Sequence, residues 1–251
     1  MPPKLIIAID GPAGSGKSST AKALAKRLKV PFIDTGAMYR ACTLKAMRLN
    51  IDLSDKRALI RAAKSARIRL AGTDPLKQRV YLDGKDVTRD IRQPELTRNV
   101  FYVAQEPVIR RHLVRLQQAM GRRSGGVMEG RDIGTVVFPD ADLKLFFKAN
   151  DRIRARRRLR ELAAAGKKAT LAEVLRDIRR RDKTDYRRTE GPLRQAKDAI
   201  AIDTSDLTID ETVDIIVKLI NPKKNPAPQK GASFVSSARS RYGRDGKPLR
   251  G

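Results

Sequence analysis

The sequence has almost none of the residues that build cysteine-based or histidine-based sites. It contains one cysteine, Cys42, and one histidine, His112, in 251 residues. A lone cysteine excludes an internal disulfide and any multi-cysteine zinc or iron–sulfur site. A lone histidine excludes the paired-histidine motifs of zinc proteases. We interpret Cys42 as a small core residue, and we expect His112 to pack or to face solvent rather than to react.

Aromatic residues and long apolar runs are also scarce. Tryptophan is absent and aromatic residues make up 4% of the chain, so base stacking on aromatic side chains is not expected to be its main activity. The early apolar run from Leu5 to Ile9 is too short for a secretion signal or a membrane span. Hydrophobic residues nevertheless reach 40%, which is enough for an aliphatic core. We therefore expect a soluble, cytoplasmic protein without a membrane partner. A separate expectation is that it acts as a monomer.

Acidic residues are few relative to basic ones. The chain has 55 Lys and Arg against 28 Asp and Glu, a net charge of +27, which favours binding of nucleic acids or phosphorylated small molecules. Residues 222–251 contribute +7 of this charge and are rich in Pro, Lys, Ser and Gly. We expect this segment to be a disordered basic tail with weak polyanion affinity and no obligatory nucleic-acid partner. The remaining +20 lies in the part that should fold.

Strand and helix signals alternate along most of the chain. Short apolar strands are expected at residues 4–10, 32–33, 127–128, 143–147 and 199–202. Helices are expected at 17–28 and 37–48, after Pro94 and Pro107, and after the capping boxes that begin at Thr170 and Thr208. This alternation predicts an α/β fold with a parallel sheet flanked by helices. In such folds the ligand crevice lies at the carboxyl ends of the strands.

An insertion of a different kind interrupts this pattern at residues 64–95. Residues 67–70 and 79–82 alternate polar and apolar side chains, and Asp83-Gly84 is typical of a hairpin turn. We therefore predict a small antiparallel sheet here. The core domain would comprise residues 1–63 and 96–221.

A phosphate-binding loop follows the first expected strand. Residues 11–18, GPAGSGKS, match the eight-residue P-loop pattern in full, with a strand before it and a helix after it. Glycines let the backbone N–H groups converge on phosphate, the lysine reaches the β- and γ-phosphates, and the serine hydroxyl can hold Mg²⁺. The alternative is a glycine-rich turn followed by a chance Lys-Ser pair, which the flanking strand and helix disfavour. The candidate ATP-binding residues are Gly11, Pro12, Ala13, Gly14, Ser15, Gly16, Lys17, Ser18 and Ser19, with Ser18 as the metal ligand.

Two further segments, each following an expected strand, carry an arginine. Residues 34–40 contain Arg40 and residues 130–135 contain Arg131. Because the carboxyl ends of parallel strands meet at one edge, both arginines should face the same crevice as the P-loop. A guanidinium group binds phosphate through two parallel hydrogen bonds. Each arginine alone could equally be a surface cation, but the pair favours a second phosphate site.

The densest arginine clusters lie at residues 148–160 and 176–188, joined by a turn at 164–168. Two basic helices joined by a flexible turn could form a lid, at about residues 154–184, that closes over a triphosphate and excludes water. The alternative is a solvated basic face, which charge alone would favour.

The motifs together resemble those of the bacterial cytidylate kinase family of P-loop nucleoside monophosphate kinases. The resemblance depends on GPAGSGKSS (11–19), DTGAMYR (34–40), EGRDIGTVVFPDA (129–141) and RRRDKTDYRR (179–188), and it covers about residues 4–220. It implies reversible transfer of the γ-phosphoryl group of ATP to CMP or dCMP with Mg²⁺. It also implies that the antiparallel insertion is a monophosphate-binding domain.

The resemblance also implies roles for individual residues. Arg40 and Arg131 would hold the CMP phosphate, and Arg181 and Asp185 would meet the ribose. Four residues would surround the cytosine: Thr35, Arg110, Asp132 and Arg188. Lys17, Arg131 and the lid residues Arg157 and Arg158 would act on the phosphates during transfer.

The chemistry of the base agrees with these roles. A carboxylate such as Asp132 accepts from the cytosine amino group, while a guanidinium such as Arg110 donates to the N3 and O2 edge. Uracil would leave buried polar groups unpaired in such a site, at about 1–3 kcal/mol each. Two departures from the family pattern concern Glu129, where an aspartate is usual, and Phe101, where a serine near the pyrimidine is frequent. We expect the first to alter metal or water geometry and the second to alter the balance between CMP and dCMP.

Two other functions are compatible with the composition. One is a P-loop kinase for another small acceptor, such as UMP or shikimate. The other is a nucleic-acid-binding protein with a secondary P-loop, which the net charge of +27 suggests.

Overall fold

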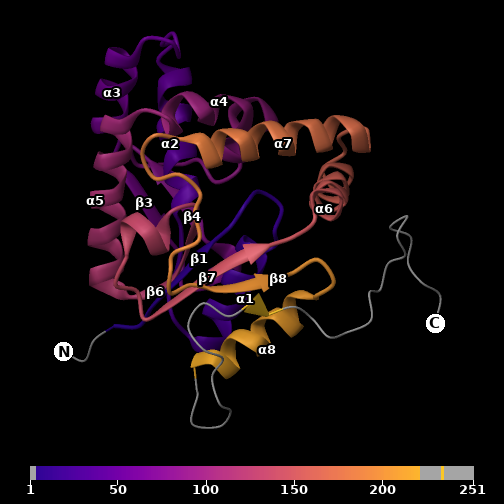
Figure 1. The fold of residues 1–251 in the computed structure, drawn as a ribbon. Coiled ribbons are helices and arrows are strands. Elements are labelled where there is room, and N and C mark those ends of the chain that lie inside the picture. The colour runs from indigo at the N-terminus through magenta and orange to yellow at the C-terminus, as the bar shows by residue number, and fades with distance from the viewer. Residues whose placement is uncertain (1–3, 221–232, 235–251) are drawn as a thin grey trace.

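A parallel sheet forms the centre of the fold in the computed structural model, which describes residues 4–220 and 233–234 (Figure 1). The strand order is β2-β6-β1-β7-β8-β9, and all neighbouring strands are parallel. The strands are β1 (Ile6–Asp10), β2 (Phe32–Asp34), β6 (Gly126–Gly130), β7 (Leu143–Lys148), β8 (Ile200–Asp203) and β9 (Ser233–Phe234). The predicted α/β class is therefore confirmed.

Helices cover both faces of this sheet, because its strands are apolar on both sides. The longer helices are α1 (Lys17–Leu28), α2 (Thr35–Arg48), α3 (Lys56–Lys64), α4 (Pro94–Ala104), α5 (Pro107–Ser124), α6 (Asp151–Ala164), α7 (Leu171–Arg187) and α8 (Ile209–Ile220). On one face, Leu24 of α1 and Ile216 of α8 pack with Ile7 and Phe147 of the sheet. On the other face, Met128 packs with a π-helical turn at Ile133–Val137 and with α5.

Side-chain caps decide where several helices begin. Thr170 and Glu173 exchange hydrogen bonds at the start of α7, and Thr208 and Glu211 do the same before α8, as their capping boxes predicted. Helix α2 begins at Thr35, two residues before the predicted start. The reason is that Oδ1 of Asp34, at the end of β2, accepts a hydrogen bond from the Ala37 N–H over 2.8 Å.

The insertion forms the predicted antiparallel sheet, with β3 (Ile68–Ala71), β4 (Arg79–Leu82) and β5 (Lys85–Asp86). A 3₁₀ turn at Pro75–Lys77 precedes β4, and another at Asp90–Arg92 follows β5. The sheet packs on α2, α3 and α5 in a second core that includes Val80 and Leu113. The sequence patterns did not predict α3. The exact domain boundaries remain a prediction.

The segment predicted to be a lid forms α6 and α7, which pack on each other through Ala155, Val174 and Ile178. The two helices follow the carboxyl end of β7 (Figure 1). The basic tail predicted at residues 222–251 lies outside the described residues, except for β9. Within the described part of the chain, every helix is too short or too polar to cross a bilayer.

Candidate functional site

The P-loop connects β1 to α1 in the geometry that phosphate binding needs. Gly16 caps α1 with φ 83°, a left-handed conformation that favours glycine, and it directs the first amides of the helix into the loop. Gly11 has no room for a side chain, since a Cβ there would lie 2.6 Å from the Phe147 carbonyl oxygen. Thr204, after β8, donates from Oγ1 to the Ser15 carbonyl over 2.8 Å. The loop is thus held by the neighbouring strands.

Lys17 is a buried cation inside this loop. Its side chain is 5% exposed, and Nζ donates to the Pro12 carbonyl over 3.1 Å. Burial, together with the positive charge of Arg131, lowers the pKa of Lys17 to about 7, while Glu129 opposes the shift. An anion bound in the loop would restore the charge of this lysine.

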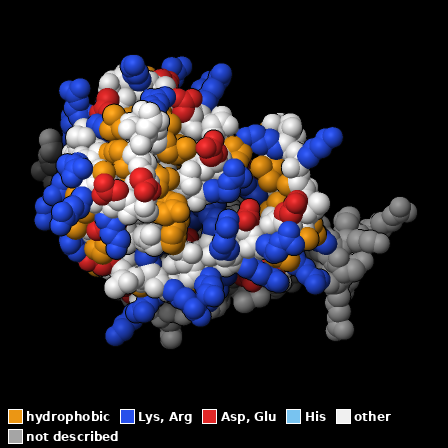
Figure 2. Space-filling model, turned by 90° about the horizontal axis from the view of Figure 1, so that it is seen from above, with side chains coloured by type: hydrophobic (Ala, Val, Ile, Leu, Met, Phe, Trp, Pro, Cys, Tyr) orange, Lys and Arg blue, Asp and Glu red, His pale blue; other side chains and the backbone are white. Residues whose placement is uncertain are grey.

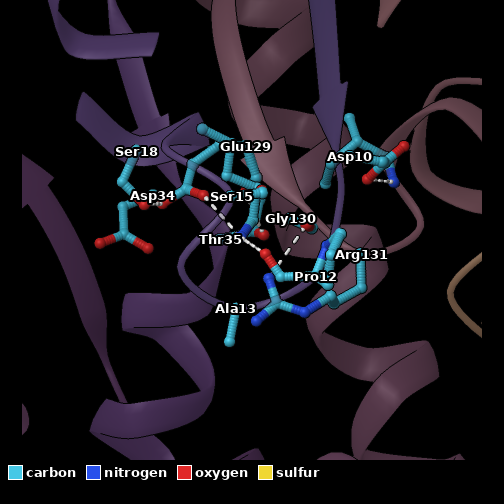
Figure 3. A network of polar contacts seen from close by, with 12 residues as sticks. Asp10, Pro12, Ala13, Ser15, Ser18, Asp34, Thr35, Glu129, Gly130 and Arg131 are labelled. Carbon is cyan, nitrogen blue, oxygen red and sulfur yellow. Dashed lines mark hydrogen bonds and ion pairs between the residues drawn. The ribbon is translucent and has the colours of Figure 1, made fainter. Parts of the chain in front are cut away.

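Ser18 and Glu129 bring two oxygen ligands together beside the loop. Ser18 Oγ donates to Glu129 Oε1 over 2.6 Å, and Glu129 lies at the end of β6 (Figure 3). Among the described residues no group of three or more His, Cys, Asp or Glu could enclose a metal. A hydroxyl and a carboxylate oxygen side by side are the kind of ligands that fit Mg²⁺, which binds few protein ligands and completes its shell with phosphate and water. The longer side chain of Glu129, noted as a departure, still reaches the serine.

A cluster of arginines around Asp185 faces the P-loop. Arg131 Nε donates to Asp185 Oδ2 over 2.7 Å, and Arg188 Nη2 donates to Asp185 Oδ1 over 2.7 Å. The close view shows Arg131 beside Pro12 and Ala13 of the loop (Figure 3). Burial, then the charge of Arg131, lowers the pKa of Arg181 to about 10, while Asp185 opposes the shift and Arg40 adds to it. The structure thus brings these five predicted residues into one charged cluster.

Arg110 and Asp132 form a buried ion pair next to this cluster. Arg110 Nη2 donates to Asp132 Oδ2 over 2.5 Å, and its Nη1 donates to the Ala104 carbonyl over 3.1 Å. The guanidinium also lies 5.4 Å from the centre of the Tyr39 ring. Gly191, with φ 57°, packs directly on the pair, and a Cβ there would overlap both side chains. The pair is therefore held from several sides.

Arg40 and Thr35 lie on α2 at the same edge of the sheet. Arg40 Nη2 lies 3.5 Å from Asp34 Oδ2, and its Nε is buried without a hydrogen-bond partner. An anion at the site could satisfy that nitrogen. Thr35 Oγ1 donates to the Glu129 carbonyl over 2.7 Å, so this hydroxyl links α2 to β6. A contact of Thr35 with a base remains a prediction.

The predicted lid arginines differ in position. Arg157 lies against the P-loop side, donating from Nη2 to the Thr204 carbonyl over 2.5 Å. Arg158 is 37% exposed and pairs with Glu161 over 2.8 Å, although its charge still reaches Arg181.

Ser19 is exposed on α1. Seen from above, Lys and Arg side chains gather around a recess in the middle of the molecule (Figure 2).

The sequence patterns did not single out Asp10 and Gly191 as parts of the site. Asp10 ends β1, and its two oxygens accept the backbone N–H groups of Ile133 and Gly134, each over 2.8 Å. Burial raises the pKa of Asp10 to about 7, although these two donors oppose the shift. The position of Asp10 directly before the P-loop could have indicated that it belongs to the site. No local sequence pattern distinguishes Gly191 in this way.

Phe101 lies on the outer side of α4 and is 42% exposed. Its ring meets that of Tyr102 edge-on, with 5.5 Å between centroids. Its effect on the choice between CMP and dCMP remains a prediction.

The fold and the site define a P-loop protein with a cluster of basic side chains facing the loop, the architecture of a small-molecule phosphotransferase. Residues 7–222 match the family model of cytidylate kinase, and the chain belongs to that family. The cytidylate kinase of Desulfitobacterium hafniense is 50% identical over 223 residues, covering 89% of this chain and 95% of that protein. The cytidylate kinase of Pelotomaculum thermopropionicum is 47% identical over 215 residues, covering 86% of this chain and 95% of that protein. In the crystal structure of a gluconokinase from Sinorhizobium meliloti, 89% of that chain aligns with 84% of this one, at 16% identity and a TM-score of 0.41.

Proposed function

We propose that this chain catalyses reversible transfer of the γ-phosphoryl group of ATP to CMP or dCMP, giving ADP and CDP or dCDP. The observation that carries the proposal is the position of Arg131. This residue is close enough to depress the pKa of Lys17 in the P-loop, and it is also bonded to Asp185 in the opposite cluster. Two anionic groups, one on each side of Arg131, would therefore meet end to end.

The donor would occupy the P-loop and a cavity beside it. The cavity has a volume of about 170 Å³ and lies between α6 and the segment before α8. Its lining includes Ile153, Arg157, Ser205 and Leu207, which offer apolar contact, a planar cation and polar groups for a nucleobase. We assign the triphosphate to residues 11–19 and the base of ATP to this cavity.

The acceptor would occupy the arginine cluster and the Arg110–Asp132 pair. Arg40 and Arg131 would hold its phosphate, since two guanidinium groups can neutralise a dianion, and Arg181 and Asp185 would meet the ribose. Asp132 would accept from the cytosine amino group and Arg110 would donate to the other edge, because the two groups lie together and are buried. Arg188 and Asp185 lie between these two parts of the cleft.

Transfer needs no protein nucleophile, because the acceptor phosphate is already anionic. The residues act by alignment and by neutralising charge on the phosphoryl group in transfer. Lys17 and Arg131 would lie on either side of that group, with Arg157 and Arg158 approaching from the lid. When bound, Mg²⁺ would supply further positive charge at the donor phosphates, held by Ser18 with Glu129 behind it.

An ADP-release assay with ATP and a panel of CMP, dCMP, UMP and AMP tests this proposal. We expect CMP and dCMP to be phosphorylated far faster than UMP, because uracil reverses the donor and acceptor pattern that Arg110 and Asp132 match. A preference for UMP over CMP would contradict the assignment of the base. Thermal stability that responds to RNA but not to CMP would favour the nucleic-acid-binding alternative.

A further inference from the structure

Arg154 in α6 is a buried cation that contacts three parts of the molecule. It is 5% exposed. Its Nη1 donates to the Ala13 carbonyl of the P-loop over 3.1 Å, and its Nε donates to the Ala149 carbonyl over 3.1 Å. Its Nη1 and Nη2 donate to Asp182 of α7 over 3.1 and 2.6 Å. One guanidinium group thus joins the donor loop to the second lid helix.

Asp182 belongs to the turn of α7 that carries the acceptor cluster. Asp185 lies one helical turn further along, and it accepts the hydrogen bond from Arg131. Arg181 is adjacent to Asp182 in sequence. The turn of α7 that carries Arg181 and Asp185 is therefore held by two arginines, by Arg154 through Asp182 and by Arg131 through Asp185.

The P-loop and α6 are also in direct steric contact at Arg154. A Cβ on Gly14 would lie 3.2 Å from both Cβ and the carbonyl oxygen of Arg154. Gly14 has φ 75°, so both its conformation and its surroundings favour glycine. A displacement of this loop would consequently displace Arg154.

A second ion pair between the same helices provides a comparison. Arg179 Nε of α7 donates to Asp151 Oδ2 of α6 over 2.8 Å, but these side chains are 62% and 30% exposed. This pair joins the two lid helices at the first residue of α6, on the solvent side. If joining α6 to α7 were the only task, an exposed pair of this kind would serve without the cost of burying an arginine.

We propose that Arg154 is a positioning residue that ties the donor-phosphate loop to the acceptor-binding turn of α7. It sets where Arg181 and Asp185 stand relative to the bound triphosphate, without touching either nucleotide itself. This inference rests on the proposed function, because it assumes that α7 holds the acceptor.

The test compares Arg154→Gln, Arg154→Lys and Asp182→Asn with the matched control Arg179→Gln. For each protein we would measure kcat and KM for CMP, the Kd of a non-hydrolysable ATP analogue, and the melting temperature. Arg154→Gln and Asp182→Asn should each raise KM for CMP about tenfold or more and lower kcat, because Arg181 and Asp185 lose their position. The Kd of the ATP analogue should change by less than about threefold, because the loop amides and Lys17 remain.

The other variants sharpen this expectation. Arg154→Lys should show a smaller rise in KM for CMP than Arg154→Gln, but should not reach the wild-type value. The reason is that a lysine ammonium group cannot donate to the Ala13 carbonyl and to both Asp182 oxygens in one plane, as the guanidinium does. The double variant Arg154→Gln/Asp182→Asn should be no worse than the worse single one, since both remove the same connection. Arg179→Gln should stay within about twofold of wild type, as expected for an exposed pair.

Three results would overturn the inference. The first is a lower melting temperature with kcat and KM unchanged at about 20 °C or below, which would indicate a purely structural role. The second is an equal loss in Arg179→Gln, and the third is a weakened Kd for the ATP analogue with KM for CMP unchanged. If Arg154→Gln fails to fold, Asp182→Asn and Arg154→Lys decide the matter. Wild-type protein that does not phosphorylate CMP would instead refute the proposed function, independently of these variants.

Discussion

Ser18 donates a hydrogen bond from Oγ to Oε1 of Glu129 over 2.6 Å, while Oε2 of Glu129 lies 4.0 Å from Nζ of Lys17. One carboxylate thus contacts the hydroxyl assigned to the metal and approaches the lysine assigned to the phosphates. Because the residues come from α1 and from the end of β6, this contact ties the donor loop to the strand that leads to Arg131.

Glu129→Gln should weaken the use of Mg²⁺ more than the binding of nucleotides. The amide can still accept from Ser18, but it loses the negative charge that supports a cation beside the loop. We expect the half-saturating Mg²⁺ concentration to rise several-fold while KM for CMP stays near the wild-type value. A Mg²⁺ titration of initial rates measures this, with Glu95→Gln, an exposed carboxyl on α4, as the control. An unchanged titration curve would remove Glu129 from the metal site.

Lys17→Ala should abolish phosphoryl transfer without unfolding the protein. Removing one cation aimed at the transferring phosphoryl group should lower kcat by about 10²–10³-fold. Folding should survive because the lysine is buried at a cost in desolvation that its pKa of about 7 reflects. Rates and circular dichroism should be compared with Lys26→Ala, an exposed residue of the same helix. Near-normal turnover would contradict the role of Lys17.

Arg131→Ala should damage acceptor binding and transfer together. Its guanidinium is bonded to Asp185 and lies close enough to Lys17 of the P-loop to lower the pKa of that lysine, so alanine removes both the proposed phosphate ligand and the partner of that carboxylate. We expect kcat/KM for CMP to fall by about 100-fold or more. Steady-state kinetics should be compared with Arg123→Ala, which lies in the last turn of α5 away from the cleft. Retention of wild-type efficiency would exclude Arg131 from the reaction.

Gly191→Ala should impair acceptor binding through the Arg110–Asp132 pair. A Cβ at this position would overlap both side chains of the pair. We expect KM for CMP to rise about tenfold or more, with little change in the Kd of an ATP analogue. Gly84→Ala is a matched control, since Gly84 also has positive φ (88°) but a Cβ there would meet no atom within 4 Å. If both variants lose stability through backbone strain but KM for CMP changes in neither, Gly191 does not shape the base site.

Asp10 should make the stability of the protein depend on pH in a defined direction. Its pKa of about 7 lies above that of an unfolded aspartate, so the folded state keeps a proton that the unfolded state releases. The stability that this group contributes is present below about pH 4 and is lost as the pH rises to about 7. Asp10→Asn is uncharged throughout this range and should lack this dependence.

Urea unfolding at pH values across this window measures the effect. The free energy of unfolding of wild type, minus that of Asp10→Asn, should fall as the pH rises. Asp140→Asn, at an exposed position, serves as the control. A difference that stays flat or rises would show that the Ile133 and Gly134 amides keep Asp10 ionised in the folded state.

Local sequence patterns determined much of this protein. The P-loop, the buried strands, the hairpin turn at Asp83-Gly84 and the capping boxes at Thr170 and Thr208 are all encoded within a few residues. Their physical causes are equally local, namely backbone conformation, side-chain alternation and hydrogen bonds to nearby amides. The order of motifs along the chain also indicated the family, which the comparisons confirm. Local patterns did not give every element or boundary, since α2 begins earlier than predicted and α3 was missed.

Only the tertiary structure decided which charged groups pair across the cleft. Arg131 with Asp185, Arg154 with Asp182 and Arg110 with Asp132 are separated by 54, 28 and 22 residues. With 55 basic and 28 acidic side chains available, no local rule selects these partners. The choice depends on how α5, α6 and α7 are rotated against the carboxyl edge of the sheet, and that rotation is set by apolar packing among distant segments.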